Sequence, residues 1–364
     1  MQMCHYHDKL LKLKKFHYLC CVMNLDLAKI ETFKELFSQP KRVVILSHTN
    51  PDGDAIGSSL ALAEVLKSLG HTVNCILPNR FPYYLKWMPK SDSLIIHSLD
   101  KLGITQSVIE SADVVICADM SSLSRLEALY EIISTNTTAK RVLIDHHLNP
   151  SDEFDIVFSF PESSSTAYLV HEILKTAYGK GVFTKDIATL LYVGMITDTG
   201  NFAFSTLNSD LFHAVADLCE TGIDIPRIYN NVYNSFTEGR ARLFGYVINR
   251  KMKTILNGRV AYMSLTENEM RKFWFQQGDS EGFVNYPLSI KKVKMSAMFS
   301  EQQGGFIRVS LRSHGNVDVN TFARRYFNGG GHLNAAGGKS FMSMEQTIAH
   351  YVASVEEYHK EGLV

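Results

Sequence analysis

Short runs of valine, isoleucine and leucine recur in the first half of the chain, and each run stops abruptly at polar residues. Three of them span residues 43–46, 114–118 and 142–144. Such runs are typical of strands that are buried on both faces of a parallel sheet. Segments with apolar residues at helical spacing alternate with them, as at residues 24–37 and 54–69. The alternation predicts an α/β fold whose N-terminal domain has a doubly wound, mostly parallel sheet.

The same domain is expected to hold a further strand at 73–77, a helix that begins near Ser163–Thr166, and a helix at 188–196. The pattern then becomes mostly helical between Ser209 and Tyr246. Beyond it, the pattern predicts a smaller, mixed α/β domain with strands at 260–265, 293–299 and 306–311 and helices at 319–327 and 344–358. We divide the chain into four segments: an extension (1–24), an N-terminal domain (25–205), a helical connector (206–249) and a C-terminal domain (250–364).

The charge of the chain is balanced, with 37 basic and 37 acidic residues among its 364. This balance argues against sequence-independent binding of long duplexes, because such binding needs a basic surface. The six cysteines lack zinc-site spacing, and Cys75 and Cys117 lie in apolar runs, as reduced core thiols do. No apolar stretch reaches the roughly 18 residues of a membrane span. We therefore expect a cytoplasmic protein without a membrane partner.

The first residues of the chain, 1–22, are basic and contain only a short apolar patch. We interpret them as a disordered extension that arises from the choice of start site. The alternative is a targeting segment, which the shortness of the apolar patch disfavours.

Polar residues that can bind metals follow three of the predicted strands. His48, Asp52 and Asp54 come after the first strand, Asp119 directly after the second, and Asp145-His146-His147 directly after the third. The carboxyl ends of parallel strands meet at one edge of a sheet, where ligands bind. So many carboxylates in one partly buried place need a compensating cation. The pattern therefore predicts a metal site, with two ions as the favoured number.

Each of these signals has a simpler interpretation when it is taken alone. The segment from His48 to Asp54 is equally compatible with a turn in which Asp54 caps the next helix. Asp119 is a common type of strand end, and Asp198 is more simply a helix-terminal residue beside Thr197 and Thr199. Taken together, three strand ends with ligand-type residues favour metal binding, and Asp198 then supplies a sixth candidate ligand.

These motifs resemble those of the DHH phosphoesterases, a family named for the triplet present here as Asp145-His146-His147. The other family motifs match His48–Asp54, Asp119 and Asp198. The C-terminal domain resembles the family's associated domain through residues 310–313 and 329–332. The resemblance covers about residues 25–355. It is greatest to the bacterial bifunctional enzymes that degrade very short oligoribonucleotides and dephosphorylate 3′-phosphoadenosine 5′-phosphate.

The resemblance implies a two-manganese centre in the N-terminal domain. One ion would have three ligands: His48, Asp52 and Asp119. The other would have four ligands: Asp54, Asp119, His146 and Asp198. Asp145 would orient His146, and His147 would face the scissile phosphate or protonate the leaving oxygen. A donor set of carboxylates and imidazoles without thiolates suits Mn²⁺ or Mg²⁺ better than a zinc thiolate site.

The C-terminal domain carries a second group of candidate residues. In the strand ending at Leu311, Arg308 and Arg312 share one face, and Arg312 lies inside the matched motif. The glycines at 329–331 can form a backbone nest for an anion, which makes Gly330, Gly331 and His332 candidate substrate-binding residues beside Arg312. The alternative is a solvent-facing strand and an ordinary glycine turn. Where the family often has a fourth glycine, this chain has Asn328, which tolerates a positive φ.

The predicted function is two-metal phosphoester hydrolysis in a cleft between the two domains, with a short single-stranded RNA or a small nucleotide as substrate. Alternatives within the enzyme class are a phosphodiesterase for cyclic dinucleotides or their linear products, and an inorganic polyphosphatase or pyrophosphatase. An alternative of a different class is a catalytically dead nucleotide sensor. A homodimer is compatible with the sequence.

Overall fold

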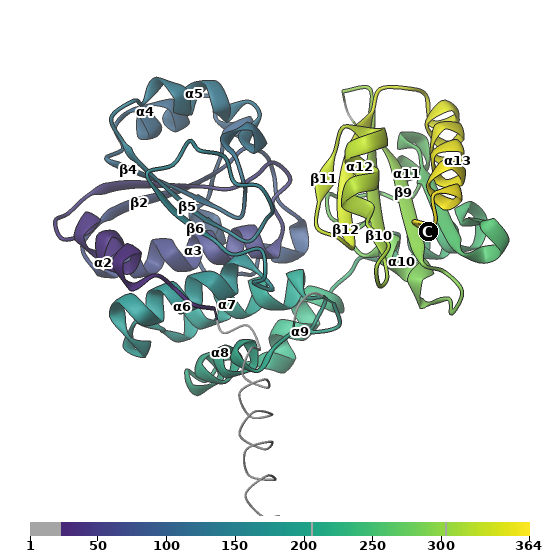
Figure 1. Ribbon diagram of the computed structural model, residues 1–364. Coiled ribbons are helices and arrows are strands. Elements are labelled where there is room, and N and C mark those ends of the chain that lie inside the picture. Colours follow the sequence, from purple (N-terminus) through teal and green to yellow (C-terminus); the bar gives the residue numbers. More distant parts are fainter. Residues whose placement is uncertain (1–22, 205–206, 303) are drawn as a thin grey trace, which may run out of the picture. The chain divides into compact units, whose positions relative to one another are not determined.

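The computed structural model describes residues 23–204, 207–302 and 304–364, so most of the extension predicted for residues 1–24 lies outside the described residues. The chain forms two compact units (Figure 1). The first runs up to Phe81 and from Leu85 to Val232. The second contains Pro82–Tyr84 and Tyr233–Val364. Among the described residues, no helix has the length and apolar character needed to cross a membrane.

A six-stranded parallel sheet forms the centre of the first unit, as the apolar runs predict. Its strands are β1 (Arg42–Leu46), β2 (Thr72–Leu77), β3 (Ile95–Ile96), β4 (Val114–Ala118), β5 (Lys140–Asp145) and β6 (Ile156–Ser159). They lie in the order β3-β2-β1-β4-β5-β6, and every neighbouring pair is parallel. The doubly wound parallel sheet is therefore confirmed. Because the direction of winding reverses between β1 and β4, a crevice is expected at the carboxyl ends of these two strands.

Helices cover both faces of this sheet (Figure 1). One face carries α4 (Ile104–Glu110) and α5 (Leu129–Thr135), which bury Ile109 and Ile133 against apolar side chains of the strands. The other face carries four helices: α2 (Leu27–Leu36), α3 (Gly53–Ser68), α6 (Thr166–Tyr178) and α7 (Lys185–Asp198). Two further helices, α8 (Ser209–Glu220) and α9 (Ile225–Tyr233), follow them in the chain.

The second unit is built on a mixed sheet in the order β11-β12-β10-β9-β8-β7. Its strands are β7 (Lys253–Ile255), β8 (Val260–Leu265), β9 (Met295–Gln302), β10 (Phe306–Ser313), β11 (Gly330–Gly331) and β12 (Ala335–Ser340). Only the β8–β9 pair is parallel. The mixed α/β domain predicted for this part of the chain is therefore confirmed.

Two helices, α12 (Val319–Phe327) and α13 (Met344–Lys360), pack on one face of the mixed sheet around an aromatic core. The Tyr351 ring lies 5.1 Å from that of Phe299 and 5.8 Å from that of Phe322. On the other face, α10 (Glu238–Tyr246), α11 (Glu267–Lys272) and the 3-10 segment Phe283–Ser289 cover β8 and β9. Apolar residues alternate on β10, so one side of that strand is buried in the aromatic core.

The glycine segment after α12 forms part of the mixed sheet, whereas the sequence predicted a backbone nest, with an ordinary glycine turn as the alternative. Gly330 and Gly331 form the short strand β11, which pairs with β12. Asn328 ends α12 with φ 47° and ψ 43°, so asparagine adopts the left-handed conformation expected of it. A Cβ atom on Gly329 would lie only 1.9 Å from the Gly337 carbonyl oxygen. Glycine is required at position 329 because the backbones of two segments meet there.

We predict that Gly329→Ala lowers the free energy of unfolding by at least about 1–3 kcal/mol, because the added methyl group displaces the β12 backbone. The matched control is Gly245→Ala on the exposed face of α10, where a Cβ atom would have no neighbour within 4 Å. That substitution should raise stability by up to about 1 kcal/mol. Calorimetry of the full chain measures both changes, and an unchanged melting temperature for Gly329→Ala would contradict the prediction.

Candidate metal centre

The loop after β1 brings His48 and Asp52 to the carboxyl edge of the sheet. Asp52, and not Asp54, is the N-cap of α3, because its Oδ1 accepts from the N–H groups of Asp54 (3.0 Å) and Ala55 (3.1 Å). The His48 side chain is buried, and its Nδ1 lies 2.9 Å from the Thr49 carbonyl oxygen. A carbonyl partner at Nδ1 favours the tautomer in which Nε2 has a lone pair for a metal ion.

Asp54 is buried in the first turn of α3, with 1% of its surface exposed. Its carboxylate accepts hydrogen bonds from the backbone N–H groups of Thr166 (2.7 Å) and Ala167 (2.8 Å). These residues form the first turn of α6, whose N-terminus carries a partial positive charge. The helix therefore offsets part of the cost of burying this carboxylate.

Asp119 lies at the centre of the cluster, directly after β4, with a left-handed φ of 62°. Its Oδ2 is 3.4 Å from Nε2 of His48, and its Oδ1 is 3.6 Å from Nε2 of His146. Thr166 donates a hydrogen bond from Oγ1 to the same Oδ1 at 3.0 Å. Because its two oxygens face different histidines, this carboxylate offers ligand atoms in two directions.

His146 and Asp198 complete the cluster on the side of Asp54. Nε2 of His146 lies 3.3 Å from Oδ2 of Asp198, at the end of α7, and 3.9 Å from Oδ2 of Asp54. Nδ1 of His146 is 3.1 Å from the Ser163 carbonyl oxygen, which orients the ring in the same manner as the His48 ring. Asp198 is half-buried, and the other two residues are buried.

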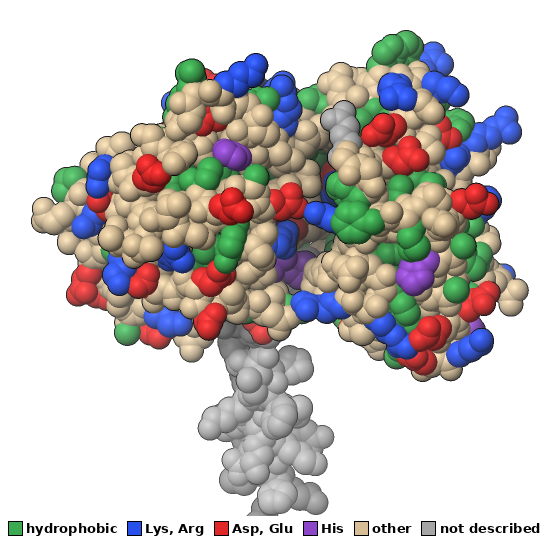
Figure 2. Space-filling model, turned by 90° about the horizontal axis from the view of Figure 1, so that it is seen from above, with side chains coloured by type: hydrophobic (Ala, Val, Ile, Leu, Met, Phe, Trp, Pro, Cys, Tyr) green, Lys and Arg blue, Asp and Glu red, His purple; other side chains and the backbone are tan. Residues whose placement is uncertain are grey.

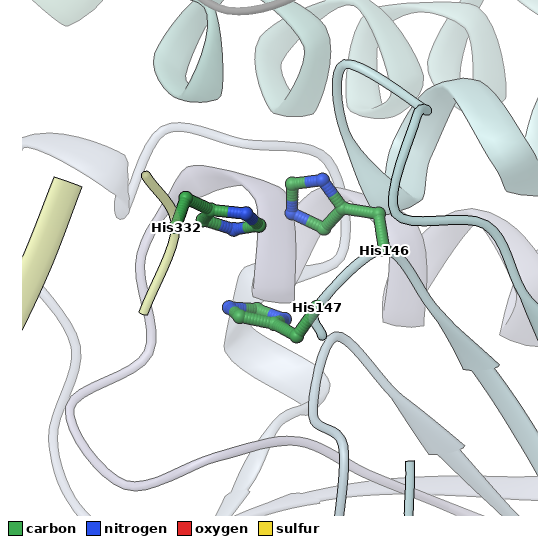
Figure 3. A group of neighbouring side chains, drawn as sticks. All are labelled: His146, His147 and His332. Atoms are coloured by element: carbon green, nitrogen blue, oxygen red, sulfur yellow. The ribbon is translucent and has the colours of Figure 1, made fainter. Parts of the chain in front are cut away.

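His147 and the adjacent His146 have different hydrogen-bond partners. The two imidazoles lie next to each other after β5, with centroids 4.9 Å apart (Figure 3). Nδ1 of His147 is 2.7 Å from Oδ1 of Asp145. Asp145 therefore orients His147, whereas the resemblance implied that it orients His146, which has Ser163 instead. The second oxygen of Asp145 is buried without a hydrogen-bond partner among the described residues.

The donor atoms fit divalent cations. Three groups of residues each place one donor atom per residue within 4.8 Å of the others: His48, Asp52 and Asp119; Asp54, Asp119 and His146; and Asp119, Asp145 and His147. Asp119 belongs to all three groups. Hard cations such as Mn²⁺ and Mg²⁺ prefer oxygen-rich sets of this kind, and imidazole shifts the preference toward Mn²⁺.

The protonation equilibria of the cluster also indicate missing positive charge. Burial raises the pKa of Asp54 well above its usual value, and the carboxylates of Asp119 and Asp198 raise it further. Burial opposes protonation of His48 and His146, yet nearby carboxylates raise the pKa of both rings above the usual value. These ligand atoms therefore bind protons more readily than the isolated side chains do, and protons would compete with a cation for them.

The candidate substrate residues lie in the second unit, with Arg312 on β10 and Gly330 and Gly331 in β11. The N–H of Gly331 donates to Oδ1 of Asn320 at 2.9 Å, and the N–H of His332 donates to the Ala335 carbonyl oxygen at 2.7 Å. These two N–H groups are used inside the unit, so they are not oriented toward an anion. Gly331 packs closely against β12, because a Cβ atom on it would lie 2.4 Å from the Ala335 carbonyl oxygen, whereas a Cβ atom on Gly330 would have no neighbour closer than 3.5 Å. Gly330 and the side chains of Arg312 and His332 remain the candidates for substrate contact.

Sequence reasoning missed three residues that support the centre: Thr49, Ser163 and Thr166. The run Ser163–Thr166 indicates a helix N-terminus, and that part of the prediction is confirmed. The run alone does not reveal that the N-terminus of this helix contacts the carboxylate of Asp54, because that contact joins residues more than a hundred positions apart.

We predict that Thr166→Val weakens Mn²⁺ binding by about 10–100-fold, because Asp119 loses the hydroxyl that fixes Oδ1. Thr166→Ser retains the hydroxyl and should bind Mn²⁺ within a few-fold of the native protein. Isothermal titration calorimetry measures the affinities, and circular dichroism confirms that both variants are folded. Equal affinity of the valine and serine variants would contradict this role.

We also predict that Mn²⁺ binding releases protons and weakens as the pH falls. The raised pKa values of Asp54, His48 and His146 mean that protons occupy ligand atoms in the metal-free protein, so affinity rises with pH. Titrations in two buffers of different ionisation enthalpy count the protons. An affinity and a proton count that stay constant from acidic to weakly basic pH would contradict the prediction.

Comparison with known proteins gives matches in both units. The model of the DHH family N-terminal domain matches residues 42–195, and the DHHA1 domain model matches residues 257–361. The bifunctional oligoribonuclease and PAP phosphatase NrnA of Mycoplasma genitalium is 29% identical over 298 residues. That alignment covers 81% of this chain and 87% of that protein.

Two solved structures are also similar. A crystal structure of an exopolyphosphatase-related protein from Bacteroides fragilis has a TM-score of 0.86 and 40% identity, covering 93% of this chain and 98% of that chain. RecJ from Thermus thermophilus, solved in complex with Mn²⁺, has a TM-score of 0.52 and 14% identity. It covers 92% of this chain and 54% of that chain, and it shows a common fold.

The DHH match precedes the DHHA1 match along the chain, and the strand ends of the first unit carry the motif residues. The alignment with the Bacteroides fragilis protein, at 40% identity, covers almost the full length of both chains. This chain therefore belongs to the DHH family of phosphoesterases, with a DHH domain followed by a DHHA1 domain.

Proposed function

We propose that this protein hydrolyses short oligoribonucleotides to mononucleotides and removes the 3′-phosphate of 3′-phosphoadenosine 5′-phosphate, with two Mn²⁺ ions as cofactors. The observation that carries the proposal is the position of Asp119, whose two carboxylate oxygens face two different buried histidines. The naming of the Mycoplasma genitalium relative as an oligoribonuclease and PAP phosphatase supports the choice of substrate.

In this proposal, one ion is held by His48, Asp52 and Asp119. The other is held by Asp54, Asp119, His146 and Asp198. Cations bound there would stabilise charge on the phosphoryl oxygens as Lewis acids and would lower the pKa of the attacking water. The protein holds the donor atoms in position through the carbonyl partners of the two histidines and through the hydroxyl of Thr166.

The role of His147 follows from its hydrogen bond. Because Asp145 accepts from Nδ1, Nε2 is the nitrogen that would exchange a proton with the leaving oxygen. The buried carboxylate fixes the tautomer and the orientation of the ring. Asp145 thus acts through His147 as a positioning residue.

Arg312 and His332 of the second unit would bind the phosphate of the distal nucleotide. A planar guanidinium group is well matched to two phosphate oxygens. The balanced charge of the chain favours a short substrate over a long nucleic acid, and on the face in Figure 2 basic and acidic side chains are interspersed.

A substrate panel tests the proposal. Initial rates with Mn²⁺ are compared for a diribonucleotide, a five-nucleotide RNA, 3′-phosphoadenosine 5′-phosphate, cyclic di-AMP and polyphosphate. The diribonucleotide and 3′-phosphoadenosine 5′-phosphate should be hydrolysed fastest. Polyphosphate is included because the Bacteroides fragilis relative is named exopolyphosphatase-related. Preferential hydrolysis of cyclic di-AMP or polyphosphate would show that the proposed substrates are wrong.

We predict that Asp119→Asn lowers the rate on the diribonucleotide by about three orders of magnitude, because the metal ions supply several kcal/mol of transition-state stabilisation. Asparagine also tolerates the left-handed φ of 62° at this position, so the fold should be retained. Asp92→Asn, an exposed aspartate in the same unit, should keep native activity. Near-native hydrolysis by the Asp119→Asn protein would refute the site.

A further inference from the structure

A left-handed residue lies midway between two of the candidate metal ligands. Asn50 has a φ of 59° and stands between His48 and Asp52 in the loop that follows β1. This conformation is less favourable than the usual ones for a residue with a side chain, and it persists where the surrounding structure holds it. The loop is anchored at its two ends by β1 and α3. Its middle residue therefore needs a contact of its own.

Asn79 makes that contact from the loop that follows β2. Its Oδ1 accepts a hydrogen bond from the backbone N–H of Asn50 at 2.7 Å, and its Nδ2 donates to Oδ1 of Asn50 at 2.8 Å. Asn79 is half-buried, and the carbonyl oxygen of the preceding Pro78 accepts from the N–H of Ser98 at 3.1 Å. Asn79 thus belongs to a segment that is itself tied to the rest of the first unit.

The Asn50 N–H and the Thr49 carbonyl group belong to one planar peptide group. Nδ1 of His48 lies 2.9 Å from that carbonyl oxygen. In a planar peptide group the N–H and the C=O point in opposite directions, so a contact that fixes the N–H also fixes the direction of the C=O. Asn79 therefore determines where the hydrogen-bond acceptor of the His48 ring lies.

The peptide group on the other side of Thr49 is also held. The N–H of Thr49 donates to the Arg125 carbonyl oxygen at 3.0 Å, in the loop that follows β4. A ring N–H that donates to a fixed carbonyl leaves the other ring nitrogen pointing in a defined direction as a metal donor. In His48 this nitrogen is Nε2, which lies 3.4 Å from Oδ2 of Asp119.

We propose that Asn79 is a positioning residue of the metal centre, which holds the Thr49–Asn50 peptide group and through it keeps the His48 ring in the orientation that binds Mn²⁺. Asn79 acts through the backbone of the loop and is not itself a ligand. The inference rests on the proposed function, because it takes His48 as a ligand of one of the two ions.

Two substitutions at position 79 test this role. Asn79→Ala removes the acceptor for the Asn50 N–H. Asn79→Asp retains an acceptor there, and half a turn of the Asn50 amide lets its NH₂ group donate to the second carboxylate oxygen. The matched control is Asn74→Ala, at a half-buried asparagine of β2.

Isothermal titration calorimetry of the metal-free full chain with Mn²⁺ measures the affinity of both sites. Asn79→Ala should weaken one site about tenfold, the lower end of the range for groups that orient a metal ligand, and leave the other within a few-fold. Asn79→Asp and Asn74→Ala should bind both ions within a few-fold of the native protein. Excess Mn²⁺ should restore the rate of the alanine variant on the diribonucleotide with an unchanged KM, because the substrate contacts are not altered.

Native affinity of Asn79→Ala at both sites would overturn the inference, and so would an equal loss in the alanine and aspartate variants. A loss at both sites with a lowered melting temperature would also overturn it, because that result indicates a general loss of structure.

The same measurements separate this role from the proposed function. If the variants bind Mn²⁺ as expected but the native protein hydrolyses none of the substrates in the panel, the proposed function fails and the role of Asn79 stands. If the native protein hydrolyses them and the alanine variant binds both ions with native affinity, the role of Asn79 fails and the proposed function stands.

Discussion

Burial of several carboxylates at one edge of a parallel sheet is the constraint on which the first unit depends. Asp54, Asp119 and Asp145 are each at most 2% exposed, and two of them lie directly at strand ends. A buried carboxylate is costly unless hydrogen bonds and opposite charge compensate it. The α6 N-terminus compensates Asp54, His147 compensates one oxygen of Asp145, and three histidines lie within 4 Å of Asp119. The remaining deficit of positive charge favours the binding of a cation at this place.

The helices that cover the sheet determine how closely these groups meet. A Cβ atom on Gly194 of α7 would lie 2.5 Å from the Ala167 Cβ and 2.8 Å from Oδ1 of Asp54. The absence of a side chain at this position lets α7 pack directly against α3 and α6. The same contact brings Asp198, at the end of α7, to His146. Gly194 is therefore needed both for the packing of α7 against α3 and α6 and for the position of Asp198.

The strand ends could be predicted from the sequence because runs of apolar residues indicate buried strands. In a parallel sheet, the carboxyl ends of such strands lie at one edge. Five strands could not be predicted. The segments of β3 and β11 are two residues long, β6 and β7 are short, and β12 contains two glycines, which weaken the strand signal. The sequence also could not show which hydrogen-bond partner each aspartate has. Asp52 rather than Asp54 caps α3, and Asp145 binds His147 rather than His146, because backbone direction after the strand decides which neighbour is within reach.

The zero net charge of the chain conceals a concentration of buried carboxylates in the first unit. Departures of this kind from the most stable arrangement are expected at functional positions, where a ligand supplies the missing charge. Cations would supply that charge in a metal-dependent phosphoesterase, whereas a nucleotide sensor without metal would leave the carboxylate cluster uncompensated.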